Sequence, residues 1–147
     1  MAYDITLKLP SPWQTETEIY NDESGAEVTH LEAHLYNPSA KRDEGYADIY
    51  VGDMPEGTDA RDQALSNYAD IVGFEDDDPE DFDPISTIMF NGRKAYGFDA
   101  FFEDDSPMMF LAQEVRKGVL VVMCAAGSDD DHLKETLSLL ERGLRVK

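Results

Sequence analysis

The chain has 147 residues, of which 41% are hydrophobic, so it is long enough to bury a core and is not a disordered polypeptide. Its 32 acidic residues against 12 basic ones give a formal net charge of −20, a field that repels nucleic acids and anionic membranes. The single cysteine, Cys124, excludes an internal disulfide. The length predicts one domain over residues 1–147. Because neither a secretory leader nor a membrane-spanning stretch is visible, we expect a cytoplasmic protein.

The N-terminal third is predicted to form strands. Residues 3–9 alternate apolar and polar side chains, which is typical of a half-buried strand that ends at Pro10. Residues 14–27 are polar and give no clear pattern. Residues 28–36 are compatible with a helix or a strand, and we favour a strand. Residues 46–52 alternate more clearly and predict a further strand.

Two helices are predicted, one in the middle of the chain and one near its end. Thr58 or Asp59 is expected to cap the first helix, and Gly73 suits its C-terminal stop. Ser128 is expected to cap the second helix. Its apolar stripe consists of Leu133, Leu137, Leu140 and Leu144, which recur at helical spacing.

A meander of strands is predicted between the two helices. Asn91-Gly92 is a type I′ hairpin signal, because both residues tolerate positive φ. The last predicted strand, residues 119–126, is apolar throughout, so both faces of the sheet must be covered. The expected strands are residues 85–90, 93–103, 108–115 and 119–126. The sequence therefore predicts an α+β fold, in which helices cover both faces of a mostly antiparallel sheet of six or seven strands.

This order of elements resembles the Mog1/PsbP-like α/β/α sandwich, which includes bacterial members of unknown function. The matching passages are residues 5–10 followed by Trp13, residues 91–98, and residues 118–126 with the closing helix. Members of this superfamily act as binding or assembly subunits, one class on a small GTPase and another on a photosynthetic complex. The resemblance therefore implies a non-catalytic module that binds a protein, although none of the family's functional residues maps here by motif.

An acidic tract follows the first predicted helix. Residues 75–83 hold seven carboxylates and no basic group, so like-charge repulsion predicts an exposed, extended segment. A protein that contacts this tract should present a basic surface. The candidate contact residues are Glu75, Asp76, Asp77, Asp78, Glu80, Asp81 and Asp83. A calcium loop is less favoured, because Asp81 stands where an EF-hand that begins at Asp76 needs glycine.

His30, Glu32 and His34 are weak candidates for metal ligands. On a strand the three side chains share one face, and on a helix the two histidines meet at positions i and i+4. Leu31 stands where a zincin motif needs glutamate. Histidines on a solvated face without a metal are the simpler interpretation, so we predict no metal and no cofactor.

No catalytic residue is predicted. The sequence contains neither a Gly-x-Ser-x-Gly elbow nor a P-loop or dinucleotide-binding motif. Cys124 lies in an apolar strand, which predicts a buried and inert thiol. Asp99, Glu103 and Glu114 could gather on adjoining strands as the carboxylates of an acid–base site, but chance gatherings are expected among so many acids. We expect a protein-binding module; the alternatives are an acidic decoy of a nucleic-acid-binding protein and a small metal-dependent hydrolase.

Overall fold

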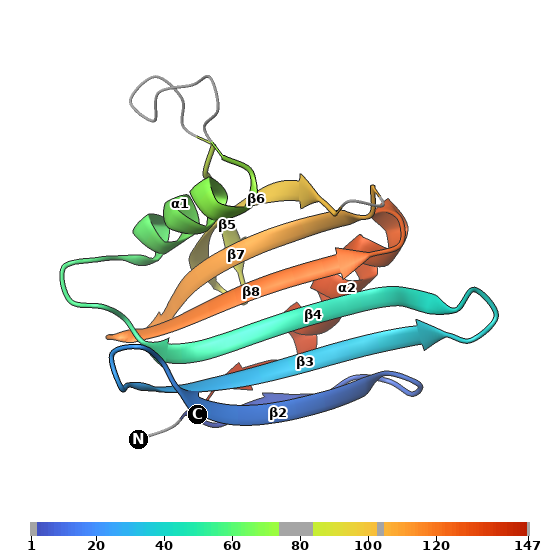
Figure 1. The fold of residues 1–147 in the computed structure, drawn as a ribbon, viewed down its shortest axis with the longest axis horizontal. Helices are drawn as coiled ribbons and strands as arrows, with labels where there is room; N and C mark the ends of the chain where they lie inside the picture. The colour runs from blue at the N-terminus through green and yellow to red at the C-terminus, as the bar shows by residue number, and fades with distance from the viewer. Residues whose placement is uncertain (1–2, 74–83, 103–104, 147) are drawn as a thin grey trace.

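A computed structural model describes residues 3–73, 84–102 and 105–146 of the chain (Figure 1). These ranges contain nine strands and two helices. In chain order they are β1 (Ile5–Leu7), β2 (Gln14–Asn21), β3 (Glu27–Asn37), β4 (Arg42–Asp53), α1 (Ala60–Ile71), β5 (Ser86–Phe90), β6 (Arg93–Phe101), β7 (Pro107–Arg116), β8 (Val119–Gly127), α2 (Asp130–Gly143) and β9 (Leu144–Val146). The protein is therefore an α+β structure, as the sequence predicts.

Seven of the described strands form one sheet in the order β2-β3-β4-β8-β7-β6-β5, and every neighbouring pair is antiparallel. This confirms the prediction of a mostly antiparallel sheet. The strand predicted at residues 3–9 does not join that sheet, because its short core β1 pairs with β9 instead. Strand β9 was not predicted.

Strand β2 was also missed by the sequence analysis. Its eight residues are all exposed, since it lies at one edge of the sheet and pairs only with β3. An exposed edge strand has no buried face, so it shows none of the apolar alternation that marks the other strands. Its alternation of threonine and glutamate over residues 15–18 was the available signal, because threonine favours strands.

The predicted hairpin at Asn91-Gly92 is confirmed. Both residues have positive φ angles, 54° and 82°, as a type I′ turn requires. The turn joins β5 to β6 and sets their register, in which Phe90 pairs with Arg93. The predicted pairing of the strands at residues 108–115 and 119–126 is likewise confirmed, as β7 and β8.

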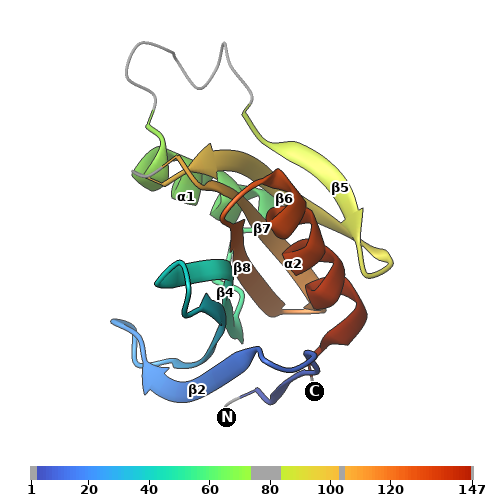
Figure 2. The same ribbon diagram turned by 90° about the vertical axis from the view of Figure 1, so that its right-hand side faces the viewer.

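The buried side chains form two clusters, and alternate residues of a strand enter different clusters. Leu111 on β7 belongs to the first cluster, together with Leu133 and Leu140 of α2. Phe110, its neighbour on β7, belongs to the second cluster, which includes Ala64 of α1. Helix α2 contacts mainly β8 and β4, whereas α1 contacts β6 and β7. Figure 2 shows the two helices at separate places against the sheet.

Trp13, between β1 and β2, packs against the core. It is half-buried against the first cluster and lies over Gly45 of β4. A Cβ atom at Gly45 would lie 2.6 Å from Cη2 of Trp13 and 3.0 Å from Oγ1 of Thr136 on α2. The glycine therefore allows the indole ring to approach both the sheet and the final helix.

The ends of the helices agree with the sequence in part. Asp59 caps α1 in a capping box with Asp62, as predicted. The prediction that Ser128 caps α2 is wrong. The backbone N–H of Ser128 donates to the carbonyl of Glu44, and Asp129 takes the cap by accepting a hydrogen bond from the backbone N–H of His132 at 2.8 Å.

The apolar stripe of α2 is also shorter than predicted. Leu133 and Leu140 are buried and Leu137 is half-buried, but Leu144 is buried in β9, after the helix has ended at Gly143. In the described ranges, neither helix is long and apolar enough to cross a membrane.

Candidate functional site

Polar side chains from three neighbouring strands share one side of the sheet, which we call the acidic face. Its residues are Glu16, Glu18 and Tyr20 of β2, His30, Glu32 and His34 of β3, and Tyr46, Asp48 and Tyr50 of β4. The strands lie side by side at the β2 end of the sheet (Figure 1). Since side chains alternate along a strand, the antiparallel register places all nine on the same side.

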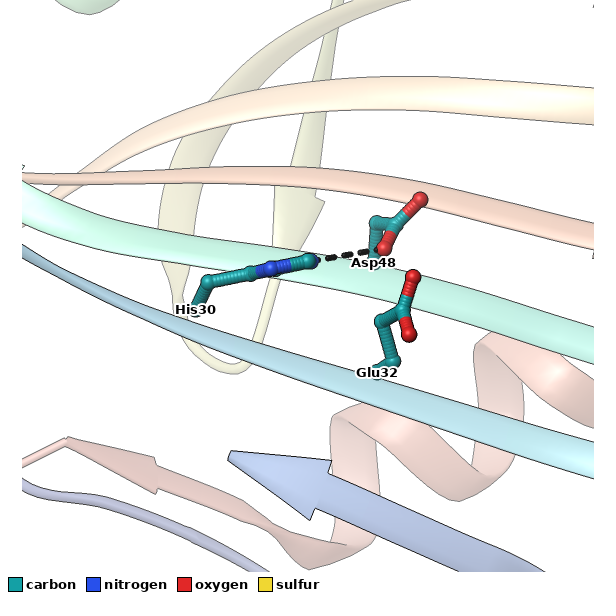
Figure 3. Close-up of side chains that lie close together, drawn as sticks. All are labelled: His30, Glu32 and Asp48. Atoms are coloured by element: carbon teal, nitrogen blue, oxygen red, sulfur yellow. Dashed lines mark hydrogen bonds and ion pairs between the residues drawn. The ribbon is translucent and has the colours of Figure 1, made fainter. Parts of the chain in front are cut away.

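The register brings one histidine and two carboxylates together at the centre of this face. Glu32 pairs directly with Asp48 across β3 and β4, and His30 is the next residue of β3 on the same face. One ligand atom from each of these three side chains lies within 4.8 Å of the other two. Figure 3 shows the imidazole ring and the two carboxyl groups directed toward one another.

Both nitrogens of the His30 ring face carboxylates. Nδ1 lies 3.1 Å from Oε1 of Glu18, and Nε2 lies 2.8 Å from Oδ1 of Asp48. The ring also stacks on Tyr50, with centroids 4.2 Å apart and an interplanar angle of 1°. Burial acts to lower the pKa of His30, but the hydrogen bonds to Glu18 and Asp48 outweigh it and the pKa is raised.

Tyr46 orients the two carboxylates of the cluster. Its hydroxyl donates to Oδ2 of Asp48 and also lies 3.4 Å from Oε1 of Glu32. Burial and the hydrogen bond to Asp48 raise the pKa of Tyr46, so the phenol keeps its proton and remains a donor. The opposite oxygen of Asp48, Oδ1, is the one that faces His30.

The acidic face is hollowed on either side of this cluster. One hollow of about 520 Å³ lies over β2 and β3 and is lined by Glu16, Thr17, Glu18, His30 and Glu32. A second, of about 480 Å³, lies between the sheet and α1, where Asp48 and Tyr50 face Gln63 and Asn67. His30 therefore borders the first hollow and Asp48 the second.

The structure changes the metal-ligand set that the sequence suggests. His30, Glu32 and His34 do share one face of a strand, but His34 is not among the three residues whose ligand atoms converge. Its Nδ1 lies 3.0 Å from Oδ2 of Asp43, and its Nε2 lies 3.8 Å from Oε2 of Glu32. Asp48 takes its place. The prediction that both histidines lie on a solvated face is wrong for His30, which is only 9% exposed.

Sequence reasoning missed Asp48, Tyr46 and Tyr50, because it considered β3 alone. The available signal was the alternation of Tyr46, Asp48 and Tyr50 within residues 46–52, which placed a carboxylate between two tyrosines on one face. Without the register between β3 and β4, that face could not be matched to His30 and Glu32.

Of two other candidate groups, one does not come together and the other lies outside the described residues. Asp99 pairs with Met109 and Glu114 pairs with Leu120, so the two carboxylates lie near opposite ends of β7. Glu103 falls outside the described residues, as do all seven acidic residues of the tract at 75–83. Their role as partner contacts stays a prediction.

Cys124 is half-buried on β8. Burial raises the pKa of its thiol to about 12, and the charge of Asp48 acts in the same direction. The thiol therefore stays protonated at neutral pH, in agreement with the prediction of an inert cysteine.

Ser128, Asp129 and His132 resemble a triad only in composition. The serine hydroxyl, at 3.3 Å, and the aspartate, at 2.7 Å, both contact Nδ1 of His132. A nucleophilic triad needs them on different ring nitrogens. The three residues therefore lie together at the start of α2, where Asp129 is the cap, and do not form a catalytic group.

Comparison with known proteins gives a fold and no activity. No family model and no curated protein matches the sequence. A Bacteroides thetaiotaomicron protein of solved structure is similar to this chain with a TM-score of 0.52 and 16% identity, over 97% of this chain and 45% of that protein. The extracellular domain of PknH from Mycobacterium tuberculosis gives a TM-score of 0.35 and 11% identity, over 97% of this chain and 84% of that one.

The likeness to the Bacteroides protein shows the fold alone, and the chain spans less than half of that protein's length. The likeness to the PknH domain is too weak to support an argument. The Mog1/PsbP-like resemblance is not addressed by these matches and stays a prediction.

Proposed function

We propose that the chain is a non-catalytic binding module whose acidic face holds a protein with a basic surface. The observation that supports this is the composition of the face, which joins four carboxylates to three tyrosines: Glu16, Glu18, Glu32, Asp48, Tyr20, Tyr46 and Tyr50. Carboxylates pair with Lys and Arg side chains, and tyrosine rings accept the same cations over their faces. Tyrosine is also enriched at protein interfaces.

Strand β2 is the accessible part of this face. All eight of its residues are exposed, and its outer edge has no neighbouring strand in the described sheet. An extended segment of a partner can add to such an edge through backbone hydrogen bonds, while Glu16 and Glu18 select basic side chains. The net charge of −20 would steer a basic partner toward the protein.

We further propose that the architecture is a Mog1/PsbP-like α/β/α sandwich formed by one domain. Two features support it: α1 and α2 belong to different buried clusters, and the segment after β1 places Trp13 against the core. Binding or assembly subunits are the functional class that this resemblance implies. The acidic tract at residues 75–83 is proposed as a second contact for the same basic partner.

The test compares two pairs of charge-removing substitutions. Glu16→Gln with Glu18→Gln alters the exposed edge of the acidic face, whereas Asp131→Asn with Glu135→Gln removes the same charge from exposed positions of α2. Proteins captured on the wild-type chain are tested against both variants over a range of salt concentrations. We expect a basic partner whose affinity falls as the salt concentration rises. The Glu16→Gln, Glu18→Gln variant should bind it more weakly, by about 0.2–1 kcal/mol of binding free energy per lost ion pair. The Asp131→Asn, Glu135→Gln variant should bind it nearly as well as the wild type does.

Two further arms distinguish the alternatives. Replacement of Asp76, Asp77 and Asp78 by Asn reports whether the acidic tract contributes to the same association. Competition by duplex DNA for the captured protein would identify the partner as a nucleic-acid-binding protein and the chain as its acidic decoy. The proposal is contradicted if the affinity changes neither with salt concentration nor with the substitutions in β2 and in the acidic tract.

A further inference from the structure

We propose that His30, Glu32 and Asp48 form a binding site for one divalent transition-metal ion of the zinc class. The inference goes beyond the proposed function, since it concerns a small ion bound by the free chain and does not depend on a protein partner.

The donor atoms already converge. Each of the three residues offers one ligand atom within 4.8 Å of the other two. Bonds of about 2.1 Å to a tetrahedral ion place its ligand atoms roughly 3.4 Å apart. The Nε2–Oδ1 distance of 2.8 Å between His30 and Asp48 and the direction of the Glu32 carboxyl group leave only small side-chain rotations to reach that geometry (Figure 3).

Glu18 holds the imidazole in the form that binds a metal. Its carboxylate accepts from Nδ1 of His30 at 3.1 Å, which places a proton on Nδ1 and leaves Nε2 directed toward Asp48. A carboxylate behind a metal-binding histidine fixes the tautomer and the ring orientation in this way. Both ring nitrogens face carboxylates, so Nε2 also carries a proton in the metal-free chain, and a metal ion that binds Nε2 would displace that proton.

The carboxylates are held in a similar manner. The Tyr46 hydroxyl contacts Oδ2 of Asp48 and Oε1 of Glu32, whereas Oδ1 of Asp48 faces His30 and Oε2 of Glu32 lies 3.8 Å from Nε2 of His34. The stacking of Tyr50 on the His30 ring fixes its plane. Each proposed ligand therefore has a supporting contact, as metal ligands in proteins do.

The donor set selects the class of ion. One imidazole nitrogen with two carboxylate oxygens suits zinc and the neighbouring divalent transition metals, whereas calcium and magnesium prefer oxygen ligands alone. Three protein ligands leave a coordination position for water, and the hollow of about 520 Å³ beside His30 and Glu32 gives access to it. The two charges of the ion would offset those of Glu32 and Asp48.

The experiment titrates the full chain, first stripped of metal by a chelator, with Zn²⁺ and separately with Co²⁺. We expect one ion per chain, measured by calorimetry, and a Co²⁺ absorption spectrum that reports nitrogen and oxygen ligands. Asp48→Asn and Glu32→Gln, which keep side-chain shape, should each weaken binding at least about tenfold. Glu18→Gln should weaken it by about ten- to a hundredfold, as the loss of a supporting carboxylate does.

Two substitutions outside the acidic face serve as matched controls. Asp131→Asn and Glu135→Gln each remove a carboxylate from an exposed position of α2, and both should leave the affinity unchanged. Circular dichroism of each metal-free variant verifies that it is folded. The proposal is overturned by a chain that binds no stoichiometric ion, by unchanged affinity in Asp48→Asn, or by binding that is lost only when Asp76, Asp77 and Asp78 become Asn. Failure to find a basic protein partner would leave this result unaffected.

Discussion

Oδ1 of Asp48 lies 2.8 Å from Nε2 of His30, although the two residues are eighteen positions apart in the chain and are not direct partners across the strands. His30 pairs with Tyr50, and Asp48 pairs with Glu32. The contact is therefore diagonal, between residues that share a face of neighbouring antiparallel strands. The ring of His30 also stacks on that of its direct partner Tyr50, and the hydroxyl of Tyr46 contacts both Asp48 and Glu32.

Leu140 of α2 is 1% exposed and belongs to the first buried cluster. Leu140→Ala should lower the free energy of unfolding by about 2–5 kcal/mol, because it removes buried methyl groups and leaves a cavity. Urea unfolding measures this change. Ser138→Ala, at an exposed position of the same helix, should alter stability by no more than about 0.5 kcal/mol. Equal effects of the two substitutions would show that α2 does not pack as described.

Gly97 on β6 has no room for a side chain. A Cβ atom there would lie 2.0 Å from the carbonyl oxygen of Phe110 and 2.7 Å from Cδ2 of Leu111. Gly97→Ala should therefore destabilise the protein by at least about 1–3 kcal/mol, because the backbone of β7 must move.

Gly52 on β4 is the matched control for Gly97. The nearest atom to its added Cβ would be Cγ2 of Val28 at 3.6 Å, an ordinary contact. Gly52→Ala should change the free energy of unfolding by no more than about 0.5 kcal/mol, so the thermal midpoint should stay nearly unchanged. If both alanine variants melt together with the wild type, the close approach of β6 to β7 is incorrect.

His132 makes stability depend on pH through the cap of α2. The hydrogen bond to Asp129 raises the pKa of His132, burial opposes this, and Glu44 and Glu135 add to the increase. A histidine whose pKa is higher in the folded than in the unfolded chain contributes its full stabilisation below the pKa of the unfolded chain, about 6.5. That stabilisation is lost as the pH rises through the pKa of the folded chain. His132→Gln should therefore lower the free energy of unfolding most near pH 6, by up to about 1 kcal/mol, and progressively less at higher pH.

The measurement for His132 is urea unfolding of wild type and variant from pH 6 to pH 9. Ser138→Ala on the same helix is the control, since neither residue titrates over this range and its stability difference should stay constant. A His132→Gln difference that grows with pH would contradict the sign of the pKa shift.

Cys124 should react slowly with thiol reagents in the folded protein. With a pKa of about 12, roughly one thiol in ten thousand is ionised at pH 8, and the thiolate is the reactive form. Labelling followed by mass spectrometry should be at least about a hundredfold slower in the native chain than in denaturant, where the pKa returns to about 8.5. Comparable rates in the two conditions would show that the cysteine is neither buried nor affected by Asp48.

The sequence by itself determined the elements that have a local signal. The Asn91-Gly92 turn, the apolar strands β7 and β8, and the amphipathic helix α2 were predictable because φ preferences and apolar periodicity act over a few residues. Asp59 as a helix cap is of the same kind, since its side chain bonds within one turn.

Tertiary structure alone decided the features that depend on pairing between distant segments. Strand β2 has no buried face, and β1 is short and pairs with β9 at the other end of the chain, so no local pattern reveals either arrangement. The candidate site follows the same rule. His30 and Glu32 stood out in the sequence, but only the register between β3 and β4 adds Asp48, because one position of slippage would turn Asp48 to the opposite face of the sheet.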